Sequence, residues 1–286
     1  MTETAPLLSV EDLVVEYPIA HGVFRAVDQV SFTVAKGSTL AVVGESGCGK
    51  STIAKSIVRL LTPTAGEIVV DGTDIARLSE RALRPFRSRI QMVFQDPYGS
   101  LDPHLTAAEI VAEPLRLRGV RSKSARHQRA AELIDRVGLP ATALHRRPAE
   151  FSGGQRQRIG IARALASEPE LLVCDEVTSA LDVSVQAQVL DLLREIQDDT
   201  GLTYVFISHN LGVVREISDT VIVMSRGKVV ERGITHDVLA HPVEPYTRAL
   251  RAAALDPTTM TGIKPRHLVS RLSTARDTAT ATAGAA

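Results

Sequence analysis

The run Gly44-Glu45-Ser46-Gly47-Cys48-Gly49-Lys50-Ser51 decides the fold of this chain. It fits the pattern G-x-x-x-x-G-K-[ST], in which glycines let backbone N–H groups turn inward around phosphate oxygens. A continuous apolar stretch, residues 39–43, precedes it, and a segment of helical character follows to residue 61. A strand before the loop and a helix whose positive end points at the same anion favour a phosphate-binding loop over a glycine-rich turn.

Two side chains in this P-loop (Gly44–Ser51) predict how a nucleotide is held. Lys50 supplies a mobile positive charge for the β- and γ-phosphates, and the Ser51 hydroxyl is a ligand for Mg²⁺, a hard ion that prefers oxygen. Thr52, the next residue, is assigned to the same site. Cys48 lies beside Lys50 and backbone donors, surroundings that lower the pKa of a thiol, so we expect a thiolate there. The sequence therefore predicts binding of ATP with Mg²⁺.

Composition narrows the class of protein. The chain has 286 residues with 44% hydrophobic content, enough for a sizeable core. Lys+Arg and Asp+Glu both number 33, so there is no basic excess of the kind that nucleic-acid-binding proteins carry. Only Cys48 and Cys174 are present, which fits a reducing cytosolic compartment. We expect no signal peptide in the first residues, and no apolar run approaches the ~20 residues needed to span a bilayer.

Alternating strand and helix signals predict a mostly parallel α/β sheet. Short β-rich or apolar runs occupy residues 13–17, 31–34, 39–43, 68–70, 90–94, 171–174, 204–207 and 221–224, with a helix at about 185–198. We assign residues 1–75 and 167–240 to an ATP-binding core with a β subdomain. Residues 76–166 are assigned to a helical subdomain. Residues 241–286 form a C-terminal segment with a mobile tail from Thr259.

An apolar strand, Leu171–Cys174, ends in two acids. A buried carboxylate is costly unless it is paired or bound to metal, so Asp175 is expected to hold the Mg²⁺ shell. Glu176 is expected to polarise the attacking water. The alternative for each is an exposed acid in a loop. His209 and Gln95 also follow strands; the first is expected to donate to a γ-phosphate and the second to contact the metal or the water.

The run Phe151-Ser152-Gly153-Gly154-Gln155 resembles the signature of ABC ATPases, with Phe at the first place. Physically it predicts a second anion site, because small residues precede a helix that we expect to begin at Gln155. The motifs occur in the order typical of that family. The resemblance implies a P-loop NTPase with the ABC ATPase fold: a mostly parallel sheet core, an antiparallel β subdomain and a helical signature subdomain.

The resemblance also implies roles for individual residues. Tyr17 matches the aromatic that stacks on adenine, the alternative being an ordinary tyrosine at a strand end. Gln95 matches the loop that senses metal and touches membrane subunits, and His209 matches the switch histidine. The run Ser179–Asp182 matches the loop that lines the dimer interface. Val177 stands where the family commonly has proline, but both acids before it are present.

Further runs resemble the oligopeptide/dipeptide importer branch. They are residues 94–103, residues 182–190 and the run His241-Pro242-Val243-Glu244-Pro245-Tyr246-Thr247. Many members of that branch carry a cysteine-bearing extension after the last motif, which holds an iron–sulfur cluster in some relatives. No cysteine follows Cys174 in this chain, so that feature is absent.

This branch implies an ATP-hydrolysing subunit that powers peptide import from the cytoplasmic face of the membrane, as a peripheral protein. The implied partners are a second ABC ATPase subunit, with a paralogue favoured, two transmembrane permease subunits and an extracytoplasmic substrate-binding protein. An alternative cargo is nickel or another small solute, since nickel importers share these motifs. A non-transport ABC protein acting on DNA or ribosomes is disfavoured because the chain has neither a long coiled-coil insertion nor a second cassette.

Overall fold

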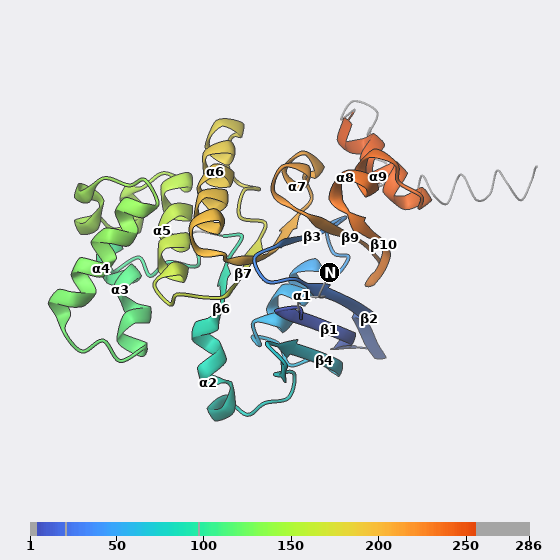
Figure 1. The fold of residues 1–286 in the computed structure, drawn as a ribbon, viewed down its shortest axis with the longest axis horizontal. Coiled ribbons are helices and arrows are strands. Elements are labelled where there is room, and N and C mark those ends of the chain that lie inside the picture. The colour runs from blue at the N-terminus through green and yellow to red at the C-terminus, as the bar shows by residue number, and fades with distance from the viewer. Residues whose placement is uncertain (1–4, 21, 97, 256–286) are drawn as a thin grey trace, which may run out of the picture.

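A computed structural model describes residues 5–20, 22–96 and 98–255 of the chain. Figure 1 shows a mixed sheet through the middle of the molecule and a smaller sheet beneath it. Helices α3, α4 and α5 lie at one side, and α8 and α9 at the other. The tail predicted to begin at Thr259 lies outside the described residues.

The larger sheet has the strand order β10-β9-β3-β8-β7-β6. The strands from β9 to β6 run parallel, and β10 pairs antiparallel with β9. Every residue of β3, β7 and β8 is buried, as expected for strands covered on both faces. The P-loop and the two acids therefore leave the sheet at the same edge, the C-terminal ends of β3 and β7. The bounds are β3 Thr39–Gly44, β6 Ile90–Val93, β7 Leu171–Asp175, β8 Thr203–Ser208, β9 Thr220–Ser225 and β10 Lys228–Ile234.

The smaller sheet is antiparallel, with the order β2-β1-β4-β5. Its apolar side chains form one core cluster with those of α1 and β3, so the helix that follows the P-loop is held between the two sheets. Cross-strand register places Tyr17 of β1 opposite Phe24 of β2. The bounds are β1 Leu8–Ile19, β2 Gly22–Val34, β4 Ala65–Val70 and β5 Thr73–Asp74.

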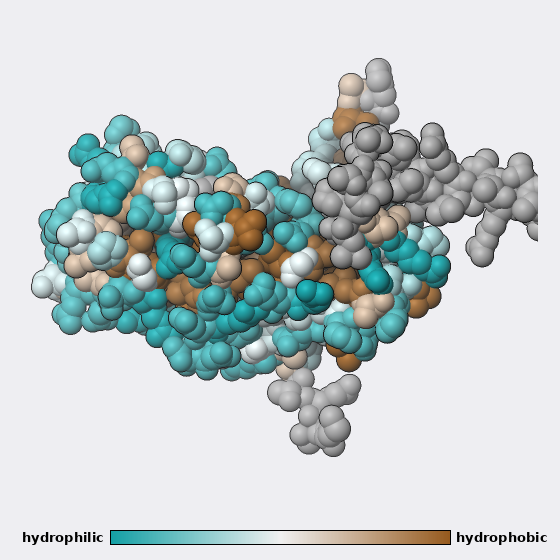
Figure 2. All heavy atoms as spheres, turned by 90° about the horizontal axis from the view of Figure 1, so that it is seen from above, coloured by the Kyte–Doolittle hydropathy of each residue, from teal (hydrophilic) through white to brown (hydrophobic). Residues whose placement is uncertain are grey.

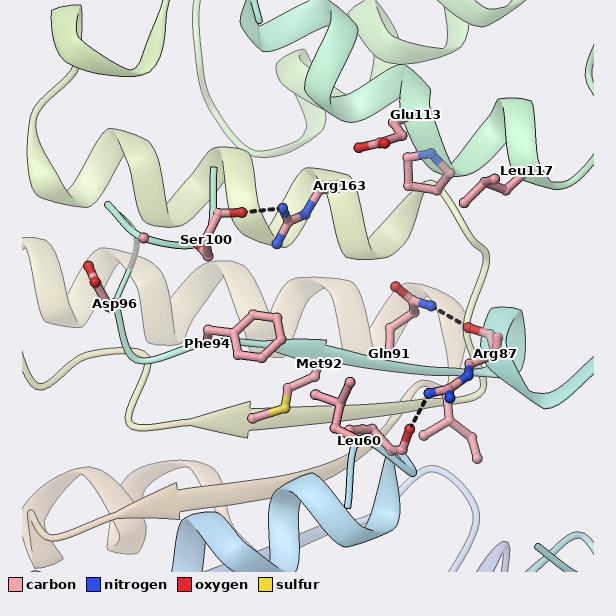
Figure 3. Close-up of a pocket in the computed structure, with 14 residues that line it drawn as sticks. Leu60, Arg87, Gln91, Met92, Phe94, Asp96, Ser100, Glu113, Leu117 and Arg163 are labelled. Atoms are coloured by element: carbon pink, nitrogen blue, oxygen red, sulfur yellow. Dashed lines mark hydrogen bonds between the residues drawn. The ribbon is translucent and has the colours of Figure 1, made fainter. Parts of the chain in front are cut away.

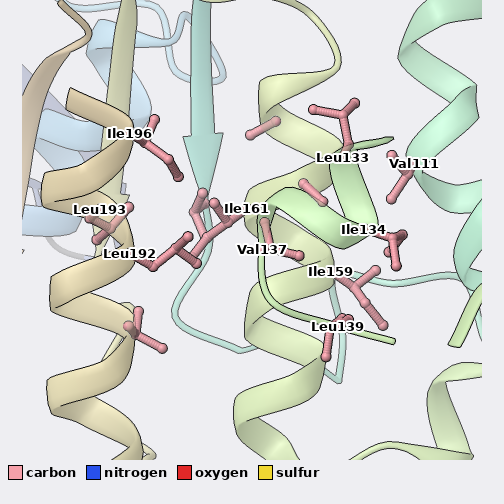
Figure 4. Close-up of a cluster of buried hydrophobic side chains, with 14 of the residues drawn as sticks. Val111, Leu133, Ile134, Val137, Leu139, Ile159, Ile161, Leu192, Leu193 and Ile196 are labelled. Carbon is pink, nitrogen blue, oxygen red and sulfur yellow. The ribbon is translucent and has the colours of Figure 1, made fainter. Parts of the chain in front are cut away.

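Helices α3 to α6 share a second core cluster with β6, β7 and β8. Figure 4 shows Ile159 and Ile161 of α5 between side chains of α4 on one side and of α6 on the other. The α-helices are α1 Lys50–Ile57, α2 Glu80–Arg89, α3 Ala107–Leu117, α4 Lys123–Arg136, α5 Gly153–Leu165, α6 Val183–Thr200, α7 Leu211–Ile217, α8 Thr235–Ala240 and α9 Pro245–Leu255. Two 3-10 turns span Ala141–His145 and Pro148–Glu150.

Several predicted boundaries were wrong. The helix after the P-loop ends at Ile57 rather than at residue 61, because Arg59 takes a left-handed conformation with φ of 55°. Its guanidinium then donates from Nε to the carbonyl of Ile75 at 2.8 Å. Strand β10 was not predicted, since it is a half-exposed edge strand that carries charged residues. Strand β1 is longer than predicted at both ends.

The predicted fold class is confirmed: a mostly parallel α/β core with an antiparallel sheet and a helical region. Strand β6 falls within residues 76–166 but pairs with β7 in the larger sheet, so this stretch is not wholly helical. Figure 2 shows a mainly hydrophilic surface with apolar side chains gathered in a central band on the face seen from above. Within the described ranges, no helix has both the length and the apolar composition of a membrane span.

Candidate nucleotide-binding site

The P-loop leaves β3 through glycines that no other residue could replace without strain. Gly44 has φ of 153°, and a Cβ there would lie 2.3 Å from the carbonyl oxygen of Met224. Gly49 has φ of 107°, and a Cβ there would lie 2.3 Å from the carbonyl oxygen of Ala26. Close backbone packing on both sides of the loop therefore requires glycine at these two positions.

Lys50 is buried, and its ammonium group lies within the curve of the loop. The Nζ atom donates to the carbonyl oxygens of Gly44 and Glu45, both at 2.8 Å. The two backbone carbonyls thus compensate the positive charge of the Lys50 ammonium group in the nucleotide-free chain, as a phosphate would in the nucleotide-bound one. The arrangement fits a lysine that exchanges carbonyl partners for an anionic one.

Ser51 and Asp175 meet across the site from different elements. The Ser51 hydroxyl donates to Oδ1 of Asp175 at 3.0 Å. Burial raises the pKa of the Asp175 carboxyl above its ordinary value, the charge of Glu176 raises it further, and the bond from Ser51 opposes the shift. A hydroxyl and a buried carboxylate with incomplete charge compensation form a donor set that fits Mg²⁺. Among the described residues, no group of three or more His, Cys, Asp or Glu side chains is arranged to hold a metal alone.

Two other predicted residues, Gln95 and His209, lie against the carboxylate of Glu176. Its Oε2 accepts a hydrogen bond from Nε2 of Gln95 at 2.8 Å, and its Oε1 lies 3.5 Å from Nδ1 of His209. Its side chain is 15% exposed, so the carboxylate is largely enclosed but keeps some access to water. The backbone at Glu176 has φ of 49°, a left-handed conformation that non-glycine residues take rarely and that is common at functional sites.

A pocket of about 310 Å³ connects these groups. Its described lining residues are Tyr17, Phe24, Ala26, Ser46, Gly47, Gly49, Lys50, Ser51, Thr52, Gln95 and Glu176. The lining includes the aromatic pair from β1 and β2, the loop glycines and Glu176. The pocket thus combines an apolar aromatic surface, a phosphate cradle and a carboxylate, which suits a nucleoside triphosphate.

The signature loop (Phe151–Gln155) begins helix α5, which starts at Gly153 rather than at the predicted Gln155. The reason is a capping box. Ser152 Oγ accepts from the Gln155 backbone N–H at 3.3 Å, and Gln155 Oε1 accepts from the Ser152 N–H at 3.1 Å. Gly154 is buried against α6, where a Cβ would lie 2.3 Å from Cγ1 of Val185.

Asp182 caps the neighbouring helix α6. Its Oδ1 accepts from the Val185 N–H at 3.0 Å and from the Ser184 hydroxyl at 2.8 Å. These bonds, with the backbone bond the larger cause, lower the pKa of the Asp182 carboxyl. The predicted interface loop is therefore held as a helix cap beside the signature loop.

The expected thiolate at Cys48 was wrong. Cys48 is buried, and desolvation raises the pKa of its thiol despite the nearby Lys50, which acts in the opposite direction. The Nζ of Lys50 is 4.0 Å from the sulfur and is already held by two carbonyls. Burial also raises the pKa of Cys174, which is fully enclosed in β7.

The structure brings most of the predicted site residues into the lining of one pocket, with Asp175 against Ser51 and His209 beside Glu176. The predicted residues in that lining are Tyr17, Ser46, Gly47, Gly49, Lys50, Ser51, Thr52, Gln95 and Glu176. The structure does not bring the signature residues Ser152, Gly153, Gly154 and Gln155 or Asp182 into the lining of that pocket as described. Figure 1 shows α1 and α5 apart, with β6 and β7 between them. The sequence predicted no role for Phe24, which lies opposite Tyr17 in the hairpin of β1 and β2. It also predicted no role for Tyr246, which contacts the P-loop.

The fold and this site define an ATP-hydrolysing P-loop protein of the ATP-binding cassette class. A family model described as ABC transporter matches residues 27–179, more than half of the chain. The chain therefore belongs to the ABC transporter family, as one of its ATP-binding subunits.

Individual relatives agree with this assignment. The chain is 52% identical to a probable peptide ABC transporter ATP-binding protein of Sinorhizobium fredii, over 87% of this chain and 72% of that protein. It is 50% identical to the oligopeptide transport ATP-binding protein AppF of Bacillus subtilis, over 85% of this chain and 77% of that protein. A solved ATP-binding cassette, dimeric in a post-hydrolysis state with ADP and Pi, matches with a TM-score of 0.74 and 31% identity. That match covers 80% of this chain and 98% of the cassette.

Proposed function

We propose that this chain is the ATP-hydrolysing motor of an ABC importer for peptides. The observation that carries the proposal is the carboxylate of Glu176, held by Gln95 and beside His209 at the end of the P-loop pocket. The peptide cargo is supported by relatives at about half identity whose names include peptide or oligopeptide transport. These names favour peptides over the alternative cargo, nickel or another small solute.

Binding of the nucleotide rests on the P-loop end of the pocket. Tyr17 stacks on the adenine, and backbone N–H groups from Gly47 to Thr52 surround the phosphates. Lys50 leaves its two carbonyl acceptors to pair with the β- and γ-phosphates. The side-chain oxygens of Ser51, Asp175 and Gln95 would hold Mg²⁺, which supplies positive charge against the phosphates when it is bound.

Hydrolysis rests on the carboxylate end. Glu176 orients and polarises the attacking water, and accepts its proton at a carboxylate oxygen as the water adds. Gln95 holds Oε2 of Glu176, which leaves Oε1 to face the water. His209, whose side chain is 57% exposed, donates to the γ-phosphate when the site closes.

A second cassette completes the site, since the P-loop and the signature loop of one chain do not share a pocket among the described residues. Ser152, Gly153, Gly154 and Gln155 would face the ATP held by the partner, and Asp182 would lie at the same interface. The dimeric state of the solved cassette supports this arrangement. We propose a paralogous ATPase as the partner.

A pocket of about 790 Å³ suits the membrane partner. Figure 3 shows Phe94, Met92 and Leu60 on one side of it and Glu113 and Leu117 on the other. Leu117 is 78% exposed and Leu60 is 54% exposed, so apolar surface is available at the rim. Because Phe94 and Asp96 flank Gln95, a cytoplasmic element of a permease subunit seated here would act directly on the residue that holds Glu176.

We propose a peripheral protein at the cytoplasmic face of the membrane, working with two permease subunits and an extracytoplasmic binding protein. The equal numbers of basic and acidic residues argue against a nucleic-acid partner. Leu117→Asp should abolish co-purification with the permease while ATP binding by the isolated chain is unchanged. The matched control is Ile234→Asp, because Ile234 is an exposed apolar residue like Leu117, at 60%, but lies in β10, away from this pocket. Retention of Leu117→Asp in the complex would refute the assignment of this pocket.

A pair of substitutions distinguishes the role of the P-loop from that of the signature loop. Lys50→Ala should weaken fluorescent-ATP binding by the isolated chain, whereas Gly153→Asp should leave it unchanged and stop hydrolysis only in the assembled transporter. The carboxylate would repel a γ-phosphate at a helix N-terminus that otherwise attracts anions. Gly153→Ala is the control, because a Cβ there meets only Leu181 Cδ2 at 3.9 Å, an ordinary contact. If Gly153→Asp weakens binding by the isolated chain as much as Lys50→Ala does, the signature acts within its own chain and the shared-site model is wrong.

A further inference from the structure

The C-terminal segment His241–Thr247 reaches the P-loop through one side chain. The phenol oxygen of Tyr246, in the first turn of α9, accepts a hydrogen bond from the backbone N–H of Glu45 at 3.1 Å. These two residues are separated by 201 positions in the sequence. The nucleotide pocket described above does not include Tyr246 among its lining residues.

The bond acts on one peptide unit that is held from both ends. The N–H of Glu45 and the carbonyl of Gly44 belong to the same peptide plane. Tyr246 accepts from the N–H end, and the ammonium of Lys50 donates to the carbonyl end at 2.8 Å. When Lys50 turns to a phosphate, the hydrogen bond from this unit to Tyr246 is the contact that continues to fix the orientation of the plane.

The Tyr246 ring is itself firmly placed. It is buried in a core cluster with Val43 of β3, the strand that leads into the P-loop. Burial raises the pKa of the phenol to about 12, so the hydroxyl stays neutral and remains an acceptor at physiological pH. A buried acceptor that stays neutral suits a permanent structural contact rather than a proton-transfer step.

The segment before Tyr246 is anchored to the edge of the larger sheet. Glu231 of β10 accepts from the backbone N–H groups of Val243 at 2.7 Å and Glu244 at 3.3 Å. Arg248 of α9 donates from Nε to the carbonyl of Pro242 at 3.0 Å. The phenol therefore sits on a segment whose position is set by β10, and β10 pairs with β9 beside β3.

We propose that Tyr246 is a positioning residue that fixes the peptide unit between Gly44 and Glu45 and thereby sets the affinity of the P-loop for ATP. The C-terminal segment is then part of the nucleotide site rather than an appendage to it. The inference rests on the proposed function only in taking the P-loop as the ATP site, which ATP binding by the unaltered protein tests separately.

The test is Tyr246→Phe in the full chain, which keeps the ring and removes the acceptor. A lost hydrogen bond to a partly buried N–H predicts ATP binding weakened by about 3- to 10-fold. In the assembled transporter, KM for ATP should rise by a similar factor with kcat within about twofold. Maleimide labelling of Cys48, which lies inside the loop, should accelerate without nucleotide, while labelling of the enclosed Cys174 stays unchanged.

Tyr204→Phe is the matched control, since the buried Tyr204 hydroxyl donates to the carbonyl of Leu193 at 2.9 Å, in a different core cluster from Tyr246. This variant should lose stability but keep wild-type ATP affinity and Cys48 reactivity. Equal weakening by both variants would assign the effect to global stability and overturn the proposal, as would wild-type affinity in Tyr246→Phe. If Tyr246→Phe does not fold, Glu231→Gln, which loosens the segment, should weaken ATP binding in the same direction, and unchanged binding there would overturn the proposal.

Discussion

Gly154→Ala is a sharp test of how the signature helix packs against α6. The added Cβ would lie 2.3 Å from Cγ1 of Val185 and 3.7 Å from its Cβ. Carbon atoms in contact are normally about 3.5–4.0 Å apart, so the two helices must separate by roughly 1 Å or the valine must rotate. Rotation is costly because valine in a helix has one strongly preferred χ1 rotamer.

Two opposing effects decide whether Gly154→Ala raises or lowers the free energy of unfolding. Alanine is favoured over glycine in a helix by up to about 1 kcal/mol, and less near the first turn, where Gly154 lies. Overpacking a well-filled contact costs about 1–3 kcal/mol. The steric cost wins, so Gly154→Ala should lower the free energy of unfolding by about 0.5–2 kcal/mol.

The assay is urea unfolding of four proteins: wild type, Gly154→Ala, Val185→Ala and the double variant. Val185→Ala removes the methyl groups that the new Cβ would meet, so Gly154→Ala in that background should stabilise the protein. The sign of one substitution thus reverses with the other, with a coupling energy of about 1–3 kcal/mol. An identical effect of Gly154→Ala in both backgrounds would refute the packing argument.

Three further outcomes follow from the site. Glu176→Gln should keep ATP binding and lose about 100-fold or more of the turnover of the assembled complex; near-normal phosphate release would exclude Glu176 as the residue that activates water. Asp175→Asn should raise the melting temperature of the nucleotide-free protein at pH 7, because the raised pKa of Asp175 means that its ionised form costs stability. That cost is absent below the unfolded pKa and grows as pH rises through the folded one, so the advantage should vanish below about pH 4, and equal melting temperatures at pH 7 would contradict it. Cys48 should react slowly with maleimide, since burial raises the pKa of its thiol, and still more slowly when Mg-ATP is bound. A rate typical of a free thiol, or equal rates with and without nucleotide, would contradict this prediction.

Local features of the site could be predicted from the sequence because short-range rules determine them. The P-loop follows a buried strand and begins a helix, so its residues are close in sequence as well as in space. The acids at the end of β7 follow the same logic, since strand ends in a parallel sheet share an edge. The meeting of Glu176 with Gln95 depends on β6 lying beside β7 in the sheet, an order that the alternation of elements did not predict.

Other features could not be predicted because they depend on long-range packing. The left-handed backbone of Glu176 leaves no residue-type signal, since glutamate is not a residue that marks this conformation. A lowered pKa was predicted for the Cys48 thiol from the nearby Lys50, but burial has the larger effect and raises the pKa. Burial is determined only by the folded chain. The contact of Tyr246 with Glu45 joins residues 201 positions apart, and the C-terminal motif that contains Tyr246 was identified only by resemblance, with no role for the tyrosine.

The two anion sites of this chain both lie at helix N-termini, and their caps explain why they act differently. Helix α1 begins at Lys50, with Gly49 as its N-cap residue, and in the described structure no side chain caps it. Its first N–H groups, which have no partner within a helix, are therefore free to bind phosphate at once. Helix α5 instead carries a capping box, in which Ser152 and Gln155 bond to each other's backbone, so the N–H of Gln155 is already held within the chain. We therefore expect the P-loop to bind ATP in the isolated chain, and the signature loop to meet an anion only when a second cassette presents one. The difference in capping between the two helices thus predicts that nucleotide binding precedes dimer closure.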